Sequence, residues 1–335
     1  MGVWGKAPIR KGGSPMKKNI FSILAIISVI IFSFFVMGCG GGEDTGVRKS
    51  SKTKVQEETD TKYVIYLITM NQGSNYWKQI NDGCAQAAKK YSNLRYEWSA
   101  PLNSTDAEQM ECIDKAVADG ANAIVISVIS PNGVNEALKR AADAGVKIIY
   151  VDSSATFPGL AIFHTDNEKA GHMAGQVMKK ALSEKGITSG VIGVGANKVV
   201  KNGILRDKGF RAEFEGTGFT VAEAFEMNGD RRNIKNYVKE HSDYVAYFGA
   251  NEQITRAMCE QINDMGIKPV VIGFDTSDYT LTQIHSGVIY ATMQQKPKKM
   301  GSDSIELAME ALEGKFKGEN EDIDLGVDVI TRDKI

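Results

Sequence analysis

The sequence predicts an α/β fold made of two lobes, each with a doubly wound parallel β-sheet covered by helices. Short apolar runs rich in β-branched residues alternate along the chain with amphipathic helical patterns. Runs such as Ala123–Val128 are continuously apolar, as expected of a strand covered on both faces. The stretch from Tyr63 to Ile335 is long enough for two domains of ordinary size. These observations together favour parallel sheets with helices on both sides.

The first half of this stretch contains four expected strands and the helices between them. The strands are Tyr63–Thr69, Leu94–Ser99, Ala123–Val128 and Lys147–Val151. Helical patterns cover Tyr76–Tyr91, the segment from Thr105 to Gly120, and a segment that ends at Gly145. Thr105 followed by Glu108 is a capping-box pattern, so a helix is expected to begin there. Gly120 and Gly145 mark helix ends because glycine adopts the left-handed conformation at low cost.

The second half repeats the pattern. Its expected strands are Gly190–Val194, Phe219–Phe225, Tyr244–Gly249 and Val270–Phe274. Five helices are expected before, between and after these strands. The first runs from Glu168 to about Gly186, the second follows the strand Gly190–Val194 and ends at about Gly216, and the third begins at Arg231. The fourth ends at Met265, and the fifth covers Asp278–His285.

Two segments echo each other at the ends of buried strands. Ala144–Lys147 leads through one apolar strand to Asp152, and Met265–Lys268 leads through another to Asp275. In open α/β sheets, ligands bind outside the carboxyl ends of the strands. Two such sheets facing each other would give a cleft lined by Asp152 from one lobe and Asp275 from the other.

The N-terminal segment reads as a signal for export. Met16-Lys17-Lys18 precedes an apolar run from Ile20 to Met37, and Gly38 then precedes Cys39. The run Val36-Met37-Gly38-Cys39 resembles the lipobox of bacterial lipoproteins, which implies that Cys39 is lipidated and becomes the mature N-terminus. The alternative is an uncleaved transmembrane anchor. We expect residues 1–38 to be a signal peptide with Met16 as the true start, and the folded part to lie outside the cytoplasmic membrane or in the periplasm.

Residues 39–62 have the composition of a flexible linker. Gly40-Gly41-Gly42 is followed by a polar, charged tract with few residues that could pack in a core. A coil of this length spans about 25–30 Å, which would hold the folded part close to the membrane.

The composition argues against several other classes of function. The net charge is −1 and no basic patch stands out, so nucleic acid is not an expected partner. Three cysteines besides Cys39 lie among apolar neighbours in helical patterns, which indicates buried thiols, without a disulfide framework: Cys84, Cys112 and Cys259. The four histidines are scattered, so no metal site is expected. No other cofactor is expected either. We expect the protein to be a monomer.

Five short motifs follow one another along the second half of the chain. They are Thr165-Asp166-Asn167-x-x-x-Gly171, Arg206-x-x-Gly209-Phe210, Phe248-Gly249-Ala250-Asn251-Glu252, Val271-Ile272-Gly273-Phe274-Asp275 and Ala291-Thr292-Met293-Gln294-Gln295. Together they resemble the type I periplasmic sugar-binding proteins, the ribose and galactose group, which are also related to the ligand-binding core of lactose-repressor-type regulators.

The resemblance implies a three-strand hinge between the lobes and closure of both lobes over a monosaccharide. The crossovers would be Thr165–Asp166, Gln295–Lys296 and roughly Asp324. The first lobe would then comprise residues 63–165 and 297–323, and the second lobe residues 166–296 and 324–335. The closed form would be presented to the permease of an ABC importer.

Carried over residue by residue, the resemblance gives the first lobe's share of the pocket. Tyr76 and Trp77 match an aromatic pair that stacks on the sugar ring, and we expect only one of them to face the cleft. The loop before them leaves Asn71 and Asn75 as competing polar contacts.

Asp152 matches an acidic residue that accepts hydrogen bonds from two sugar hydroxyls. Ser153 stands where the ribose-binding proteins have arginine, and Ser127 stands where they have asparagine, which argues against ribose itself.

The second lobe would contribute four polar residues: Arg206, Asn251, Asp275 and Gln295. A second stacking aromatic is missing, since Asn228-Gly229 lies near its place. Each polar residue also has a structural interpretation, because Asp152, Asn251 and Asp275 could cap the following helices and Arg206 could pair with Asp207.

The sequence therefore predicts a solute-binding lipoprotein for a neutral monosaccharide or cyclic polyol. The alternative is a receptor subunit of the same fold that presents its ligand to a histidine kinase or chemoreceptor. An enzyme is disfavoured because Arg206 and Gln295 suit holding a ligand better than glycoside hydrolysis. A cytoplasmic regulator is excluded by the export signal and the missing DNA-binding headpiece.

Overall fold

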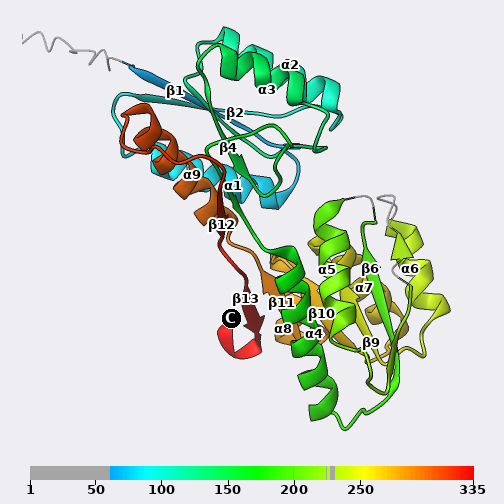
Figure 1. Cartoon of the computed structure of the whole chain (residues 1–335). Helices are drawn as coiled ribbons and strands as arrows, with labels where there is room; N and C mark the ends of the chain where they lie inside the picture. Colours follow the sequence, from blue (N-terminus) through cyan, green and yellow to red (C-terminus); the bar gives the residue numbers. More distant parts are fainter. Residues whose placement is uncertain (1–60, 199, 224, 227–230) are drawn as a thin grey trace, which may run out of the picture. The chain divides into compact units, whose positions relative to one another are not determined.

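The computed structural model describes residues 61–335 except 199, 224 and 227–230. Cys39, the expected signal peptide and nearly all of the expected linker lie outside the described residues. Within the described part, the chain forms two β-sheets, each covered by helices (Figure 1). This agrees with the fold class expected from the sequence.

The first sheet has six parallel strands in the order β12-β5-β4-β3-β1-β2. The strands are β1 (Tyr63–Ile68), β2 (Leu94–Ser99), β3 (Ala123–Ile126), β4 (Lys147–Val151), β5 (Ala161–His164) and β12 (Glu321–Asp324). The helices are α1 (Asn75–Ala88), α2 (Asp106–Ala118), α3 (Asn135–Asp143) and α9 (Pro297–Leu312). Two apolar cores fill the two sides, one beneath α1 and α9 and the other beneath α2 and α3 (Figure 1). We call this unit the first lobe.

The second sheet has the order β13-β11-β10-β9-β6-β7, with β8 paired to β6. The strands are β6 (Gly190–Ala196), β7 (Phe219–Val221), β8 (Phe225–Glu226), β9 (Ala246–Gly249), β10 (Val270–Phe274), β11 (Ala291–Gln294) and β13 (Asp328–Thr331). The helices are α4 (Asn167–Glu184), α5 (Lys201–Ala212), α6 (Arg231–Glu240), α7 (Glu252–Met265) and α8 (Asp278–Ser286), followed at the end of the chain by a 3₁₀ turn, η1 (Arg332–Lys334). The pairs are parallel except that β13 runs antiparallel to β11. We call this unit the second lobe.

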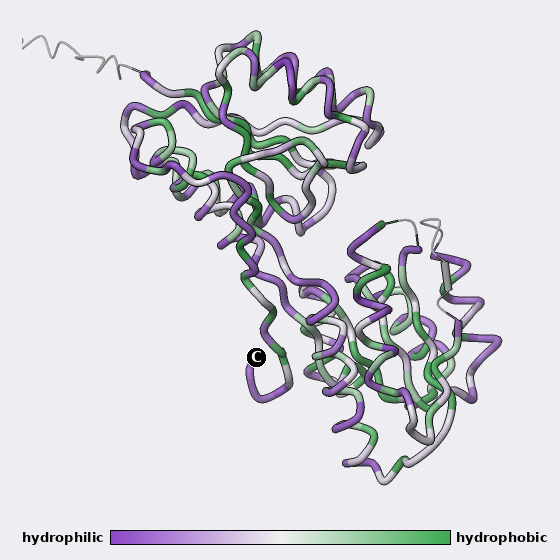
Figure 2. Tube along the Cα trace, in the orientation of Figure 1, coloured by the Kyte–Doolittle hydropathy of each residue, from purple (hydrophilic) through white to green (hydrophobic). Residues whose placement is uncertain are grey.

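Hydropathy along the chain explains why each sheet is buried. Apolar residues gather on the strands and on the inward faces of the helices, while the outward faces are hydrophilic (Figure 2). The central strands β3, β9 and β10 are buried along their whole length, as parallel strands covered on both faces should be.

Glycines allow two helix pairs to cross at very short distance. A Cβ on Gly83 of α1 would lie 2.0 Å from the carbonyl oxygen of Lys298 in α9, and one on Gly301 would lie 2.1 Å from that of Ile80. Gly171 of α4 and Gly209 of α5 make the same kind of approach in the second lobe. Any larger residue at these crossings would push the helices apart.

The chain passes between the sheets three times. The passages lie between β5 and α4, between β11 and α9, and between β12 and β13. Two of them are tied together, because the amide of Asp166 donates to Asp324 Oδ1 at 2.9 Å and His164 Nε2 lies 2.5 Å from Asp322 Oδ1.

Several elements differ in detail from the expectations. The expected strand Phe219–Phe225 is split into β7 and β8. The capping box at Thr105 is half formed: Thr105 accepts from the Glu108 amide at 3.3 Å, but the Glu108 carboxylate turns to Asn103. A complete box is found at Ser277 and Thr280.

The three remaining cysteines are free thiols; Cys84 and Cys259 are buried as expected, whereas Cys112 is only half-buried. Burial raises the pKa of Cys84 and of Cys259 to about 12, so both stay protonated at neutral pH. No helix within the described part of the chain is both long and apolar enough to span a bilayer.

Candidate ligand-binding site

A cavity of about 380 Å³ is lined by residues of both lobes. They come from the loops after β1, β4, β6, β9, β10 and β11 and from the helices that follow. These loops lie at the carboxyl ends of parallel strands, where α/β sheets bind ligands. Eight of the residues expected from the sequence line it: Asn75, Tyr76, Trp77, Asp152, Arg206, Asn251, Asp275 and Gln295.

Asp152 and Asp275 occupy equivalent places in the two lobes. Each directly follows a central strand, β4 or β10, and each has a positive φ, 62° for Asp152 and 65° for Asp275. Each amide donates to the adjacent strand, to Phe163 O at 2.9 Å and to Met293 O at 2.7 Å. Such left-handed backbone costs about 1–3 kcal/mol in a non-glycine residue and is concentrated at functional sites. The two similar sequence segments therefore have the same backbone geometry, and each ends in a carboxylate at the carboxyl end of a strand.

Tyr76 reaches the carboxylate of the first lobe. Its hydroxyl donates to Asp152 Oδ1 at 2.9 Å and lies 3.4 Å from Gln295 Oε1 of the second lobe. Burial, and then the charge of Asp152, raise the pKa of Tyr76 well above its ordinary value, so the phenol remains a hydrogen-bond donor. Trp77 is only 7% exposed, belongs to the apolar core under α1, and meets the Tyr76 ring edge to face at 5.0 Å.

Arg206 on α5 lines the cavity and makes three contacts within the second lobe. Its Nε donates to Asn167 Oδ1 at 2.7 Å, Nη1 donates to Ala250 O at 2.9 Å, and the guanidinium lies 3.7 Å from the centre of the Phe274 ring. Burial lowers the pKa of Arg206 from its ordinary value, an effect opposed by the charges of Asp275 and Asp152. The surface pairing with Asp207 does not occur, because Asp207 bonds to Arg211 instead.

Asp275 accepts a hydrogen bond from Gln295 Nε2 at 2.9 Å. Burial raises the pKa of this carboxyl, and the nearby Arg206 works in the opposite direction. Asp275 does not cap α8, since Ser277 does so. Asn251 plays both parts that the sequence left open: its side chain lines the cavity and caps α7 by accepting from the Ile254 amide at 2.9 Å.

Three of the expected residues do not line the cavity. Asn71 turns its side-chain oxygen to the amides of Gly73 and Ser74 and so shapes the loop before α1. Ser127 is fully buried, and its hydroxyl has no hydrogen-bond partner among the described residues. Ser153 donates to Asp152 Oδ2 at 2.9 Å from behind.

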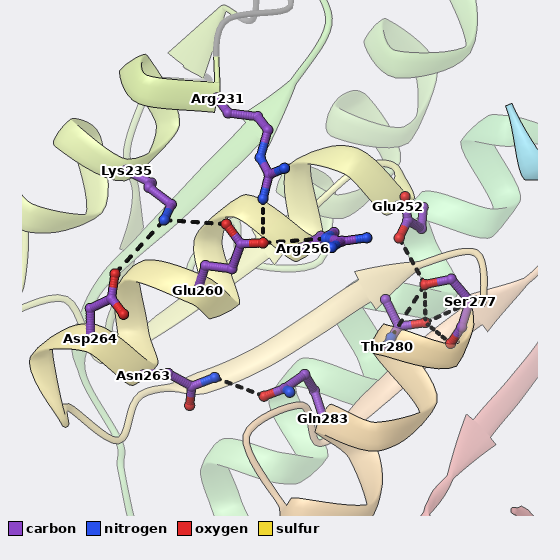
Figure 3. A network of polar contacts seen from close by, with 10 residues as sticks. All are labelled: Arg231, Lys235, Glu252, Arg256, Glu260, Asn263, Asp264, Ser277, Thr280 and Gln283. Atoms are coloured by element: carbon purple, nitrogen blue, oxygen red, sulfur yellow. Dashed lines mark hydrogen bonds and ion pairs between the residues drawn. The ribbon is translucent and has the colours of Figure 1, made fainter. Parts of the chain in front are cut away.

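Two important residues of the wall were missed by the sequence reasoning. Asn202 of α5 donates through Nδ2 to Asp152 Oδ2 at 3.2 Å, which joins the second lobe to the first. Glu252 lines the cavity and accepts from Ser277 Oγ at 2.7 Å (Figure 3). Glu252 follows Asn251 in the quoted motif, and Asn202 lies in the first turn after a strand-end loop, so position alone could have indicated both.

Figure 3 also shows a second polar cluster on α6 and α7, away from Glu252. Glu260 meets three cations there, Arg231, Lys235 and Arg256. This network of ion pairs links α6 to α7. None of its four residues lines the cavity. Nowhere in the described ranges do three or more histidine, cysteine or acidic side chains gather as a metal site would need.

A family model described as a periplasmic binding protein domain matches residues 65–316. The chain belongs to this family. The resemblance to the type I sugar-binding group read from the motifs is thereby confirmed.

Individual relatives cover most of the chain. The ribose import binding protein of Haemophilus influenzae is 23% identical over 80% of this chain and 90% of its own length. The D-apiose import binding protein of Paraburkholderia graminis is 23% identical over 73% of this chain and 80% of its own.

A solved solute-binding protein from Burkholderia graminis, in complex with D-arabinose, is 25% identical with a TM-score of 0.74, covering 82% of this chain and 96% of its own. Another, from Actinobacillus succinogenes with bound D-allose, has a TM-score of 0.74 at 16% identity and covers 82% and 99%. The similarity to these structures supports the fold described above. Both solved proteins are described as solute-binding proteins of ABC transporters.

Proposed function

We propose that this chain is an extracytoplasmic solute-binding lipoprotein that binds a monosaccharide or cyclic polyol between its two lobes and delivers it to an ABC importer. The observation that supports this most directly is the pair of strand-end carboxylates, Asp152 and Asp275, in one cavity with the buried Arg206. A carboxylate accepts two hydrogen bonds at once, which suits vicinal hydroxyls, and each such bond contributes about 1.5–3 kcal/mol. The relatives' sugar ligands support the same class of solute.

The aromatic and amide side chains complete a sugar-like environment. Tyr76 offers a ring face or edge against the apolar C–H groups of a pyranose, while Gln295 and Asn251 offer both donors and acceptors. Binding with micromolar affinity requires about 8 kcal/mol net, which several buried hydrogen bonds and one aromatic contact can supply.

Closure of the lobes around the ligand would be the output of the protein. The proposed lobes are residues 63–165 with 297–323 and residues 166–296 with 324–335, joined at the three passages between the sheets. A ligand that bonds to Asp152 and to Asp275 contacts both lobes, so it favours the arrangement in which both contacts form. A permease that recognises this arrangement would then respond only to the loaded protein.

The ligand class is tested by binding measurements on residues 57–335, a fragment that contains the whole described part of the chain. Thermal shift and calorimetry against pentoses, hexoses, inositols, nucleosides and amino acids should show a rise in melting temperature with one sugar or polyol class. The Asp275→Ala variant should lose this rise. The matched control Asp278→Ala, which changes an exposed acid on the first turn of α8, should keep it. A rise confined to nucleosides or amino acids would overturn the sugar assignment.

The membrane anchor is tested separately at Cys39. Cells fed labelled palmitate should label the wild-type protein and leave the Cys39→Ala variant unlabelled and released from the membrane fraction. Labelling that persists in the variant would contradict lipidation at Cys39.

Uptake of the identified sugar by cells with and without the protein separates delivery from sensing. Loss of uptake supports the importer role. Unchanged uptake with loss of a transcriptional or motile response would support the receptor alternative.

A further inference from the structure

The charges around the cavity do not balance. Among the described residues, its lining contains three carboxylates, Asp152, Glu252 and Asp275, and one guanidinium, Arg206, and the other lining side chains of this part of the chain are uncharged. Three negative charges and one positive charge leave a net charge of −2 on the described wall of the site.

None of these four groups forms an ion pair with another residue of the described chain. Arg206 is held by an amide oxygen, a backbone carbonyl and an aromatic ring. Asp152 accepts hydrogen bonds from Tyr76, Ser153 and Asn202, all of which are neutral donors.

The other two carboxylates are also met only by neutral groups. Asp275 accepts from the amide of Gln295, and Glu252 from the hydroxyl of Ser277. Glu252 lies in the first turn of α7, where the positive end of the helix dipole offsets part of one charge. An offset of about half a charge still leaves the wall negative.

Charges withdrawn from water are normally paired in proteins, because an unpaired charge loses the solvation that water would give it. Here Asp152 and Arg206 are buried, and Asp275 and Glu252 are half-buried. Asp275 shows this strain: burial raises its pKa first, and Asp152 and Glu252, both of the same sign, raise it further, against the effect of Arg206. A cation placed in the cavity would relieve the like-charge repulsion among all three carboxylates.

We propose, resting on the function proposed above, that the ligand is a polyhydroxylated ring carrying a protonated amine, that is, an amino sugar or an aminocyclitol. An ammonium group has three donors and no acceptor, which complements carboxylates that can only accept. The ring hydroxyls are then left to the amides of Asn75, Asn251 and Gln295 and to the remaining donors of Arg206.

The experiment compares matched trios of ligands that differ only at one substituent. D-glucosamine, D-glucose and N-acetyl-D-glucosamine form one trio, and the three galactose equivalents form another; myo-inositol and an inosamine are added as a pair. Equilibrium dissociation constants are measured on the full chain in detergent at pH 7 and low ionic strength. At least one amine should bind ten or more times more tightly than its hydroxyl and acetylated partners. Raising the salt concentration should reduce the preference, because screening weakens charge interactions.

Two variants and one control locate the preference in the cavity. Asp275→Asn should reduce the ratio of amine to hydroxyl affinity towards one. Ser153→Arg, which adds a positive charge beside Asp152, should reduce it as well. The control Asp278→Asn, outside the cavity, should leave the ratio unchanged, and melting curves establish that all variants are folded.

The outcomes separate this inference from the broader proposal. Tighter binding of neutral sugars than of their amines overturns the inference and leaves the sugar-binding function standing. An amine preference unchanged in both cavity variants also overturns it. Failure of every sugar, polyol and amine to bind refutes the inference and the proposed function together.

Discussion

Replacing Asp275 by asparagine should weaken ligand binding and, at neutral pH, stabilise the ligand-free protein. The side chain is nearly isosteric, and its Oδ1 can still accept from Gln295 Nε2. What changes is the charge. Hydrogen bonds to a carboxylate contribute about 1.5–3 kcal/mol each, against about 0.5–1.5 kcal/mol for a neutral acceptor. Two ligand bonds to this group then lose about 2–3 kcal/mol, which corresponds to a rise in Kd of about 30- to 140-fold.

The stability effect follows from the direction of the pKa shift. Burial raises the pKa of Asp275 above the value of 3.8 expected in the unfolded chain. Well below pH 3.8 the group is protonated in both states and does not affect stability. As the pH rises towards the folded-state pKa, the unfolded chain ionises first, so the wild-type protein loses stability, and above that pKa the loss is complete.

The asparagine variant lacks this titration. Its melting temperature should equal that of the wild type most nearly at pH 4, exceed it increasingly as the pH rises, and level off above the folded-state pKa. One kcal/mol corresponds to about 2–4 °C for a domain of this size. Differential scanning calorimetry between pH 4 and pH 8, with calorimetric titration of the ligand, measures both effects.

A variant that is less stable than the wild type at pH 7, or whose stability difference is independent of pH, would refute the reasoning. It would mean that Arg206 and the amide of Gln295 compensate fully for the burial of Asp275. Unchanged affinity in a folded variant would show that the ligand does not contact this carboxylate.

Three further substitutions test other contacts. Tyr76→Phe removes the donor to Asp152 and should lower the free energy of unfolding by about 1.5–3 kcal/mol, as measured by urea denaturation; an unchanged midpoint would show that this bond adds nothing. Asn202→Ala removes a bond between the lobes and should raise the ligand Kd about tenfold by calorimetry with little change in melting temperature, and equal affinity would argue against a role at the site. Gly83→Ala places a Cβ 2.0 Å from Lys298 O, so thermal melting should show a loss of about 1–3 kcal/mol, whereas wild-type stability would mean that α1 and α9 can separate freely.

The sequence by itself determined the class of fold and the positions of the two carboxylates. Continuous apolar runs are long enough to identify the central strands, because a strand buried on both faces leaves no polar positions. Asp152 and Asp275 each end such a run, so each is expected at the carboxyl edge of its own sheet, where α/β sheets bind ligands.

The strands β5, β11, β12 and β13 were not expected from the sequence, whereas the edge strands β2 and β7 were. β12 reads Glu-Asp-Ile-Asp, and only its pairing with β5 makes it a strand. β5 and β13 are equally short; β5 lies between β4 and the distant β12, and β13 pairs antiparallel with β11. Local pattern cannot reveal a strand that is held by its neighbours and not by its own burial.

Only the tertiary structure decided which side chains reach the cavity. Tyr76 and Trp77 are consecutive and both line the cavity, but Trp77 belongs to the apolar core, whereas the Tyr76 hydroxyl donates to Asp152. Ser127 follows a central strand as Asp152 does, but its side chain is fully buried and does not line the cavity. Periodicity fixes which face of an element is covered, whereas contact between residues such as Asn202 and Asp152 depends on how whole elements pack.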